Sequence, residues 1–223
     1  MYKALIGFYF FASNAFAQEL DLGAQSSTGV VSPETLFPFR NLTAILFTIY
    51  IVLGLAVFAI AMLKCERTWR SRFSLSDLPW SAKLAVSLSL LSYGFVHVLG
   101  LTGAYLVSTI SFKSAAEYFF YMKLAKLVGT SHAHLFGHAT MYALTSAVFI
   151  FSKISERWKI VFIGMALGAG LLDVPSWWAI KYGGDDYEIF SAISGVMSVI
   201  GWGSMAAVVI FELLFSKSRK VKS

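Results

Sequence analysis

The chain of 223 residues has few of the residues that build soluble or disulfide-linked domains. Charged residues make up 13% of it, whereas globular domains usually contain about 25%. The single cysteine, Cys65, excludes an intramolecular disulfide and a cysteine-rich metal site. The sequence also has no P-loop, no dinucleotide-binding fingerprint and no C-x-x-C-H attachment sequence for haem. These absences argue against nucleotide-driven chemistry and against covalently bound c-type haem.

Long apolar runs are what the chain has in abundance. Hydrophobic residues make up 57% of it, and several blocks exceed the roughly 18 to 20 residues needed to cross a bilayer. We expect five transmembrane helices, at residues 41–63, 82–110, 131–152, 160–180 and 189–215. The predicted fold class is therefore all-α: a polytopic membrane bundle of five transmembrane helices (41–215) after an N-terminal signal-like segment.

The first residues have the layout of a secretory signal peptide. In residues 1–17, Lys3 precedes an apolar run that ends in small residues, which predicts cleavage before Gln18. An uncleaved first helix is the alternative. Residues 18–40 are then an exported N-terminal segment, rich in turn-forming residues.

Two further segments lie outside the predicted spans. Residues 111–129 mix lysines with Phe, Tyr, Met and Leu at helical spacing, which predicts an interfacial helix on the outer surface. We take this segment to end where the third span begins near Ser131, with Thr130 or Ser131 as the helix cap. Residues 216–223 form a basic tail, expected in the cytoplasm.

The distribution of basic residues predicts the orientation. With residue 18 outside, the inside segments 64–83, 153–159 and 216–223 hold 12 Lys and Arg, and the outside segments 18–40, 111–130 and 181–188 hold 5. This agrees with the positive-inside rule. We expect a multi-pass protein of a bacterial-type cytoplasmic (inner) membrane, with the mature N-terminus outside and the C-terminus in the cytoplasm. The net charge of +6 is explained by this asymmetry, and no nucleic-acid partner is predicted.

Few ionisable residues fall inside the predicted spans, and each charged one costs about 2.5 to 3.5 kcal/mol there. Glu212 stands beside the basic tail, where it is expected to reach water. The others are candidates for function by default. They are His97, His132, His134, His138 and Asp173.

His134 and His138 are the best candidates for a metal site. They are four residues apart, so their side chains share one face of a helix and can bind a transition metal at two points. His132 points to another side, near the surface. Asp173 is predicted at the same depth as His138, where it can ligate the metal directly or orient a metal-bound imidazole. A hydrogen bond between helices, just before Pro175, is an equally open role for Asp173.

His97 is a candidate haem ligand because glycines surround it. A haem b held by His97 and His138 is one interpretation, although the helical rise predicts a difference in depth of about 10 Å between them. A neutral His97 bonded to a neighbouring helix is the other. Small residues also recur at helical spacing in Gly164-x-x-x-Gly168 and in the series Ser194, Ser198 and Gly201, which permits close helix contacts.

These residues lead to three hypotheses of function. The first is a redox or metal-binding subunit that carries haem b, copper or iron and passes electrons between a quinone and an exported protein partner. The second is a transporter or metal-handling protein that uses the same histidines and Asp173 as a proton or metal relay. The third is an accessory or scaffold subunit. No catalytic set of side chains is apparent, so a subunit of a larger complex in the lipid bilayer is expected rather than an independent enzyme.

Overall fold

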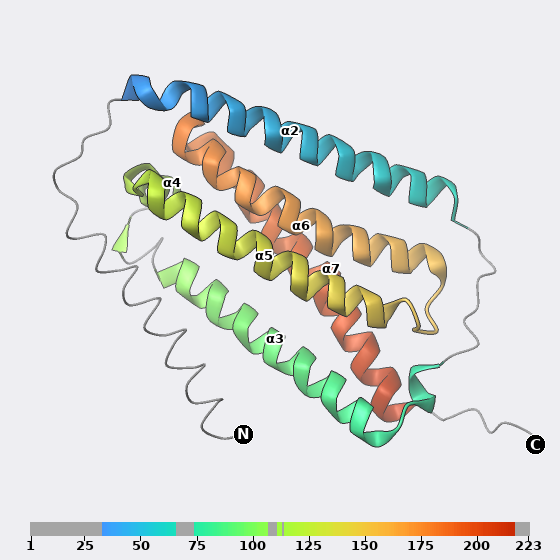
Figure 1. Cartoon of the computed structure of the whole chain (residues 1–223). Coiled ribbons are helices and arrows are strands. Elements are labelled where there is room, and N and C mark those ends of the chain that lie inside the picture. The colour runs from blue at the N-terminus through green and yellow to red at the C-terminus, as the bar shows by residue number, and fades with distance from the viewer. Residues whose placement is uncertain (1–32, 66–73, 107–110, 113, 217–223) are drawn as a thin grey trace, which may run out of the picture.

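The computed structural model describes residues 33–65, 74–106, 111–112 and 114–216, with side chains from residue 41 onward. This part of the chain is helical throughout and contains no strand, so the all-α prediction is confirmed. Long helices run side by side along the bundle (Figure 1): α2 (Pro33–Leu63), α3 (Trp80–Leu106), α5 (Leu124–Phe149), α6 (Glu156–Gly183) and α7 (Glu188–Phe215). The short elements are η1 (Leu75–Asp77), α4 (Ala115–Tyr121) and η3 (Asp185–Tyr187).

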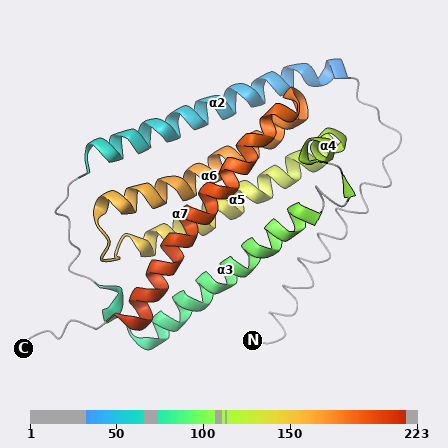
Figure 2. The same ribbon diagram turned by 180° about the vertical axis from the view of Figure 1, so that it is seen from behind.

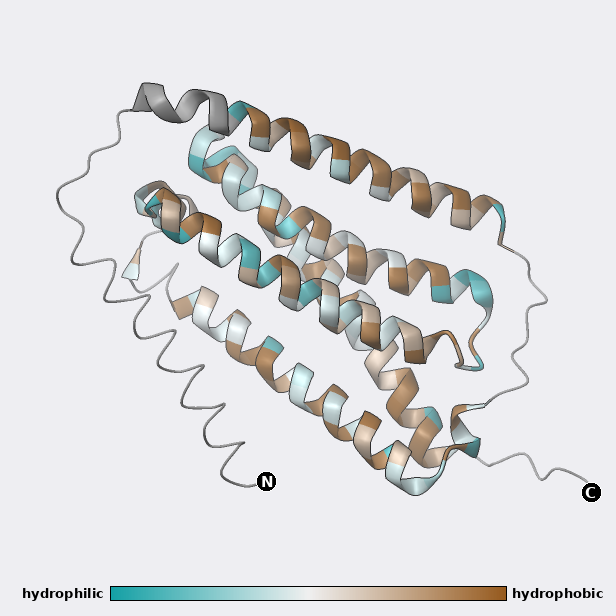
Figure 3. Ribbon diagram, in the orientation of Figure 1, coloured by the Kyte–Doolittle hydropathy of each residue, from teal (hydrophilic) through white to brown (hydrophobic). Residues whose placement is uncertain are grey.

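Within the described residues, four stretches are long and apolar enough to cross a membrane: Asn41–Leu63, Trp80–Leu106, Glu156–Gly183 and Asp185–Phe215. They coincide with the first, second, fourth and fifth predicted spans. The third, 131–152, falls on α5, which is similar in length but less apolar and is not among the four. Figure 3 shows this contrast, because polar residues recur along α5 whereas α2 is hydrophobic along most of its described length.

The predicted interfacial helix at 111–129 is divided in the structure. α4 ends at Tyr121, and the extended backbone of Met122 and Lys123 separates it from α5, which begins at Leu124. The second half of the predicted segment is therefore the start of α5. Thr130 and Ser131 lie within that helix, so the predicted cap there is wrong. No Gly or Pro marks the break, which is why the sequence pattern runs through it.

Several predictions fall wholly or partly outside the described residues. The signal-like segment 1–17 does so entirely, as do residues 217–223 of the basic tail and residues 107–110 of the second predicted span. The segment 18–40 is described only from Pro33, where α2 begins.

The centre of the bundle is the close crossing of α6 and α7. A Cβ atom at Gly201 of α7 would lie 2.6 Å from the backbone nitrogen of Ala166 and 2.9 Å from the carbonyl oxygen of Phe162, both on α6. Only glycine fits at this distance. The close contact predicted from the small-residue series is therefore confirmed at Gly201. Figure 2 shows α7 crossing over α5 and α6.

Glycines also bring α2 against α6. A Cβ atom at Gly164 would lie 2.2 Å from the Phe58 ring, and one at Gly54 would lie 2.6 Å from Leu171 Cδ1. The rest of α2 is largely exposed, with Val57 at 68% and Leu55 at 63%. In a membrane protein such exposed apolar side chains suit contact with lipid.

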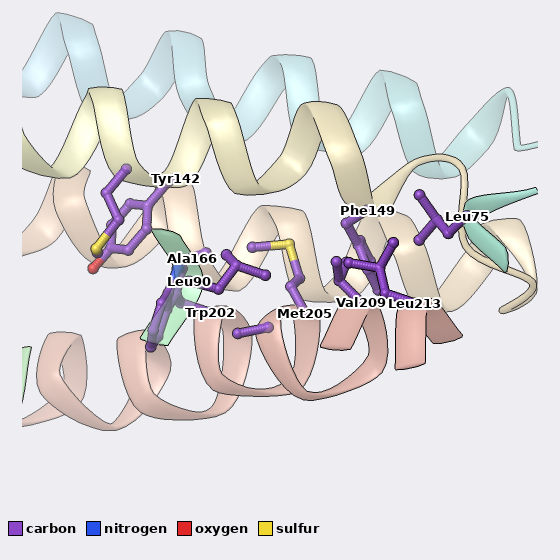
Figure 4. Close-up of a cluster of buried hydrophobic side chains, with 11 residues drawn as sticks. Leu75, Leu90, Tyr142, Phe149, Ala166, Trp202, Met205, Val209 and Leu213 are labelled. Carbon is purple, nitrogen blue, oxygen red and sulfur yellow. The ribbon is translucent and has the colours of Figure 1, made fainter. Parts of the chain in front are cut away.

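Buried apolar residues form two clusters. The first, which we call the large core, joins α3, α5, α6, α7 and η1 (Figure 4) and consists of Leu75, Leu90, Met141, Tyr142, Phe149, Ala166, Trp202, Met205, Ala206, Val209 and Leu213. The second, the α4 cluster, consists of Phe119, Met122, Leu127, Val174, Trp177, Trp178 and Ile180. They lie toward opposite ends of the bundle, which we call the η1 end and the α4 end.

Glu212 lies at the η1 end, near the end of α7. The prediction that it reaches water is wrong for the most part, because it is only 6% exposed. Its Oε1 accepts a hydrogen bond from the backbone N–H of Lys153 at 2.7 Å. Glu212 therefore ties the connection between α5 and α6 to α7.

Candidate functional site

A ladder of three aromatic rings runs along one face of α5. His134, His138 and Tyr142 follow each other at steps of four residues, which places them on one side of the helix. The ring centroids of His134 and His138 are 5.8 Å apart. The rings of His138 and Tyr142 are stacked, with centroids 5.3 Å apart. The two imidazoles thus share a face, as their spacing predicted.

Hydrogen bonds extend this ladder from α5 to α7 and α3. Tyr142 Oη lies 2.6 Å from Ser198 Oγ on α7, and Ser198 Oγ lies 2.8 Å from His97 Nε2 on α3. The His97 ring stacks on Trp202, whose Nε1 donates to Thr145 Oγ1 at 3.0 Å. We call the resulting series the histidine line: His134, His138, Tyr142, Ser198 and His97.

One face of α6 packs against the ladder, while the His134 side chain stays exposed. Gly170, Asp173 and Trp177 are spaced three and four residues apart, so they lie on the same side of the helix. A Cβ atom at Gly170 would lie 3.3 Å from His138 Cβ. One end of this face is thus packed against His138, and the other end meets His134, whose ring centroid is 4.8 Å from that of Trp177.

Asp173 lies between these two contacts and is bonded to α7. Its Oδ1 accepts a hydrogen bond from Ser194 Oγ at 2.9 Å. Trp177 and His134 are close enough to interact with its carboxyl group. Beside it, the helix contains Pro175, which has no N–H, and Ser176 Oγ donates to the Asp173 carbonyl at 2.6 Å. Asp173 therefore makes the bond between helices that was one of its two expected roles.

The tautomer of His134 follows from its partner. His134 Nδ1 lies 3.1 Å from the carbonyl oxygen of Thr130, one turn earlier in α5. A carbonyl oxygen only accepts, so a hydrogen bond here requires a proton on Nδ1. In the neutral ring this leaves Nε2 with a free lone pair. His138 differs, because its buried Nδ1 has no hydrogen-bond partner within the described part of the chain.

The structure brings some predicted ligands together and separates others. His134 and His138 are adjacent, and Asp173 lies on the face of α6 whose neighbouring residues, Gly170 and Trp177, contact these two rings. His97 reaches His138 through Tyr142 and Ser198, which occupy the interval that the sequence left between the two histidines. His132 is exposed. Among the described residues, no group of three or more His, Cys, Asp or Glu side chains is placed to hold a metal ion.

Three residues of this region were not predicted as functional. Tyr142 continues the four-residue spacing of His134 and His138, so extending the pattern by one step would have found it. Ser198 was considered only as a small residue for helix packing. Trp177, which in the sequence is only an aromatic near the end of a predicted span, touches His134. Both depend on which helices face each other, and the sequence does not contain that information.

A comparison with known families places the chain among membrane proteins. Residues 100–220, more than half of the chain, match the family model Aq_1264_TM, a transmembrane helical domain. The matched segment contains His134, His138 and Asp173, whereas His97 precedes it. No curated protein and no solved structure is significantly similar to the chain.

Proposed function

The chain belongs to the Aq_1264_TM family of transmembrane helical domains, and we propose that it is a proton-carrying subunit of a larger membrane assembly. In this proposal the histidine line moves protons between the α4 end of the bundle and the interior of the membrane. Asp173 takes part near His134, and His97 is the innermost group. The assembly brings other membrane or exported subunits to the line.

One observation carries the proposal: groups that both accept and donate protons connect three helices. Tyr142, Ser198 and His97 form consecutive hydrogen bonds of 2.6 and 2.8 Å. A hydroxyl or an imidazole can accept a proton on one side and release one on the other. His134 and His138 meet edge to face, and His138 and Tyr142 are stacked, with no hydrogen bond in either pair. Bridging waters have to complete both of these steps.

The cost of these residues also supports a function. Polar and ionisable side chains are expensive within a membrane, so they are rare there and usually mark proton or ion pathways. Here Tyr142 of α5 and His97 of α3 both bond to Ser198 of α7, and His138 stacks on Tyr142. Apolar residues would pack the same helices without this cost.

Five crossings, with α5 as the third, form part of the proposal. η1, at the start of α3, packs on α7, and Lys153 before α6 bonds to Glu212 near the end of α7. α4, which follows α3, is instead bound by Lys181 near the end of α6. α3 and α6 therefore start at the same end of the bundle and finish at the other (Figure 1). Because α5 lies between α3 and α6 in the chain, it has to run back from the α4 end to the η1 end, which makes it the third of five crossings in this proposal.

The distribution of charge supports an orientation for these crossings. Three segments that adjoin the η1 end in the sequence, 64–83, 153–159 and 216–223, are rich in Lys and Arg. By the positive-inside rule this end faces the cytoplasm and the α4 end faces outward. We therefore propose a bacterial-type inner-membrane protein with an exported N-terminus, from which the signal-like segment 1–17 is removed.

Cofactor binding is the second candidate function, and the two imidazoles of the ladder favour it. Metal-bound histidines usually donate their other ring N–H to a carbonyl or carboxylate, and the bond from His134 Nδ1 to the Thr130 carbonyl has this form. His138 Nδ1 has no partner among the described residues. A copper or iron ion on His134 and His138, oriented by Asp173, or a haem b with His97 and His138 as ligands, would make the subunit a redox carrier between a quinone and an exported partner.

Absorption spectra separate the second candidate from the first. The detergent-purified protein is measured in oxidised and reduced forms, with elemental analysis of the same sample. A Soret band that shifts on reduction, or stoichiometric copper or iron lost in His138→Ala but kept in His132→Ala, supports the redox subunit. A colourless protein without bound metal contradicts it.

The proton function is tested by the exchange of the His97 ring N–H with solvent. It is followed by ¹⁵N NMR of histidine-labelled protein in liposomes. If protons reach His97 along the line, Tyr142→Phe slows this exchange, because it removes the hydroxyl that connects Ser198 to His138. If the bonds are only structural, the same substitution loosens the packing and the exchange becomes faster. His132→Gln, a change at an exposed histidine outside the line, is the control and should leave the rate unchanged.

A further inference from the structure

The histidine line is closed toward the η1 end by the large core. Beyond Tyr142 and Trp202 come Phe149, Met205 and Val209, each 0% exposed. Figure 4 shows these side chains between Tyr142 at one end of the large core and Leu75 at the other. They belong to α5 and α7, which each run the length of the bundle. Opening this side would require the long helices to separate.

The α4 end is closed by a cluster that includes a much smaller element. Phe119 of α4 and Met122, just after it, are 8% and 5% exposed, and they complete the α4 cluster. α4 has only 7 residues. Its removal would take these two side chains away from the α4 cluster and leave the long helices in place.

Lys181 holds the end of α4. Its Nζ donates to the carbonyl oxygens of Met122, Phe120 and Phe119, at 2.6, 3.0 and 3.3 Å. The carbonyls of Phe120 and Met122 lie at the C-terminal end of α4, where helix carbonyls lack intrahelical partners, whereas the Phe119 carbonyl also accepts from the backbone N–H of Met122. One side chain on α6 thus satisfies the end of α4, and its positive charge suits the negative end of the helix dipole.

Glu188 holds the start of α4. Its Oε1 accepts a hydrogen bond from the backbone N–H of Ala116, and Ser114 Oγ caps the same turn by accepting from Glu117 N at 3.1 Å. Glu188 is the first residue of α7. α4 is therefore fastened at its two ends to two different long helices, in each case by a charged side chain.

Trp177 connects α4 to the histidine line. Its ring stacks on Phe119 of α4, with centroids 5.4 Å apart, and meets the His134 ring edge-on at 4.8 Å. It also lies beside the carboxyl group of Asp173. His134 itself is exposed, so α4 can control only the access of water past Trp177 from the α4 end. A displacement of α4 would uncover this tryptophan, which lies directly against His134.

We propose that α4 is a cap that opens the histidine line to water at the α4 end alone, with Lys181 and Glu188 as its latches. This inference rests on the proposed proton function and adds a means of regulating the access of water to the line. The cap is closed when Phe119 is stacked on Trp177. It opens when the bonds of the two latches break, because these bonds and the contacts of Phe119 and Met122 fasten α4. The large core keeps the η1 end closed in both states.

The test measures how fast the His138 ring N–H exchanges with solvent, by ¹⁵N NMR in liposomes. Lys181→Met removes the three hydrogen bonds that Lys181 Nζ makes to the end of α4 but keeps a long apolar side chain. We expect about 10- to 100-fold faster exchange, since a hydrogen bond to a charged group contributes about 1.5 to 3 kcal/mol and each 1.4 kcal/mol is a factor of ten. Lys181→Arg keeps donors and should exchange more slowly than Lys181→Met.

The matched control is Asp186→Asn, which removes a charge from the exposed turn between the two latch residues. It should leave the rate as in the unaltered protein. Unchanged exchange in Lys181→Met, or equal acceleration in Asp186→Asn, overturns the cap. This outcome is independent of the Tyr142→Phe experiment. Faster exchange in Lys181→Met supports the cap even if Tyr142→Phe shows that protons do not follow the line. Slower exchange in Tyr142→Phe likewise supports the proton function even if Lys181→Met shows no cap.

A crosslink covers the case in which Lys181→Met does not fold. Ala116→Cys and Glu188→Cys are introduced in a Cys65→Ser background, at the two residues that meet at the start of α4. In this one protein the oxidised form should exchange His138 more slowly than the reduced form. Equal rates in the two forms would show that α4 does not control access.

Discussion

The two ends of the helix bundle are closed by clusters of similar chemistry but different construction. At the η1 end, the large core interdigitates side chains from α3, α5, α6 and α7, and Phe149, Val209 and Leu213 are completely buried. At the α4 end, the cluster depends on Phe119 and Met122, which a short helix supplies. The first closure is a property of the long helices themselves, whereas the second has a separable part.

The difference teaches how a membrane bundle can be rigid at one end and adjustable at the other. Helix association within a membrane depends on close packing rather than on the hydrophobic effect, because lipid is as apolar as the helices. The glycine crossing at Gly201 supplies such packing beside the large core. α4 is instead held by the side-chain hydrogen bonds of Lys181 and Glu188, which can break and re-form without separating the long helices.

Replacing one phenylalanine in each cluster tests the comparison most strongly. Phe149→Ala should lower the free energy of unfolding by about 3 to 5 kcal/mol, because it leaves a cavity between long helices. Phe119→Ala should cost clearly less, since α4 can move away while the bundle stays folded. Thermal unfolding in detergent measures both. Equal losses would show that the α4 cluster is as integral to the bundle as the large core.

The α6–α7 crossing gives the next largest effect. Gly201→Ala places a methyl group against the backbone of α6 and should destabilise the protein by about 1 to 3 kcal/mol, the usual cost of overpacking. Gly203→Ala is the matched control, because a Cβ atom there meets nothing within 4 Å. It should be neutral or slightly stabilising, since Ala favours a helix over Gly by up to about 1 kcal/mol. A tolerated Gly201→Ala would contradict the close crossing.

Much of this fold is predictable from the sequence because apolar length alone marks a spanning helix. Asn41–Leu63 and the helices α3, α6 and α7 follow from that rule. α5 is harder to predict as a spanning helix, because the histidines of the candidate site lower its hydropathy. The break at Met122 and Lys123 depends on tertiary contacts: Lys181 satisfies the carbonyls at the end of α4, and no local sequence signal announces it.

The candidate site is predictable only along each helix. The spacing of His134 and His138 places both imidazoles on one face, and the structure has them there. The neighbours across the helix interface could not be predicted: Ser198 between Tyr142 and His97, and Ser194 at Asp173. Periodicity fixes which face a residue occupies on its own helix. The rotation of one helix against another depends on the packing of all of them.

A methyl group at Gly170 probes the junction between the histidine line and the large core. Its Cβ would lie 3.3 Å from His138 Cβ and 3.4 Å from Tyr142 Cε2. Gly170→Ala should therefore move both rings slightly and cost about 1 kcal/mol, with a shifted ¹⁵N signal for His138. Gly195→Ala, which meets nothing within 4 Å, should leave that signal in place. Equal shifts in the two variants would argue against the close packing of α6 on the ladder.

The smallest effect is expected for Glu212→Gln, a substitution at the residue that fastens the η1 end by its hydrogen bond to Lys153. Glu212→Gln keeps an oxygen that accepts from the backbone N–H of Lys153 and replaces the other oxygen, which is buried without a hydrogen-bond partner among the described residues, by an uncharged NH2 group. Because the bond to Lys153 is kept, the free energy of unfolding should change by less than about 1 kcal/mol. Glu212→Ala leaves that N–H without its acceptor and should cost about 1 to 3 kcal/mol. Thermal unfolding of the two variants measures the difference. If Gln costs as much as Ala, the charge of Glu212 matters more than its bond to Lys153. The η1 end would then depend on electrostatics, as the α4 end does, and the contrast between the two closures would be weaker than their contacts indicate.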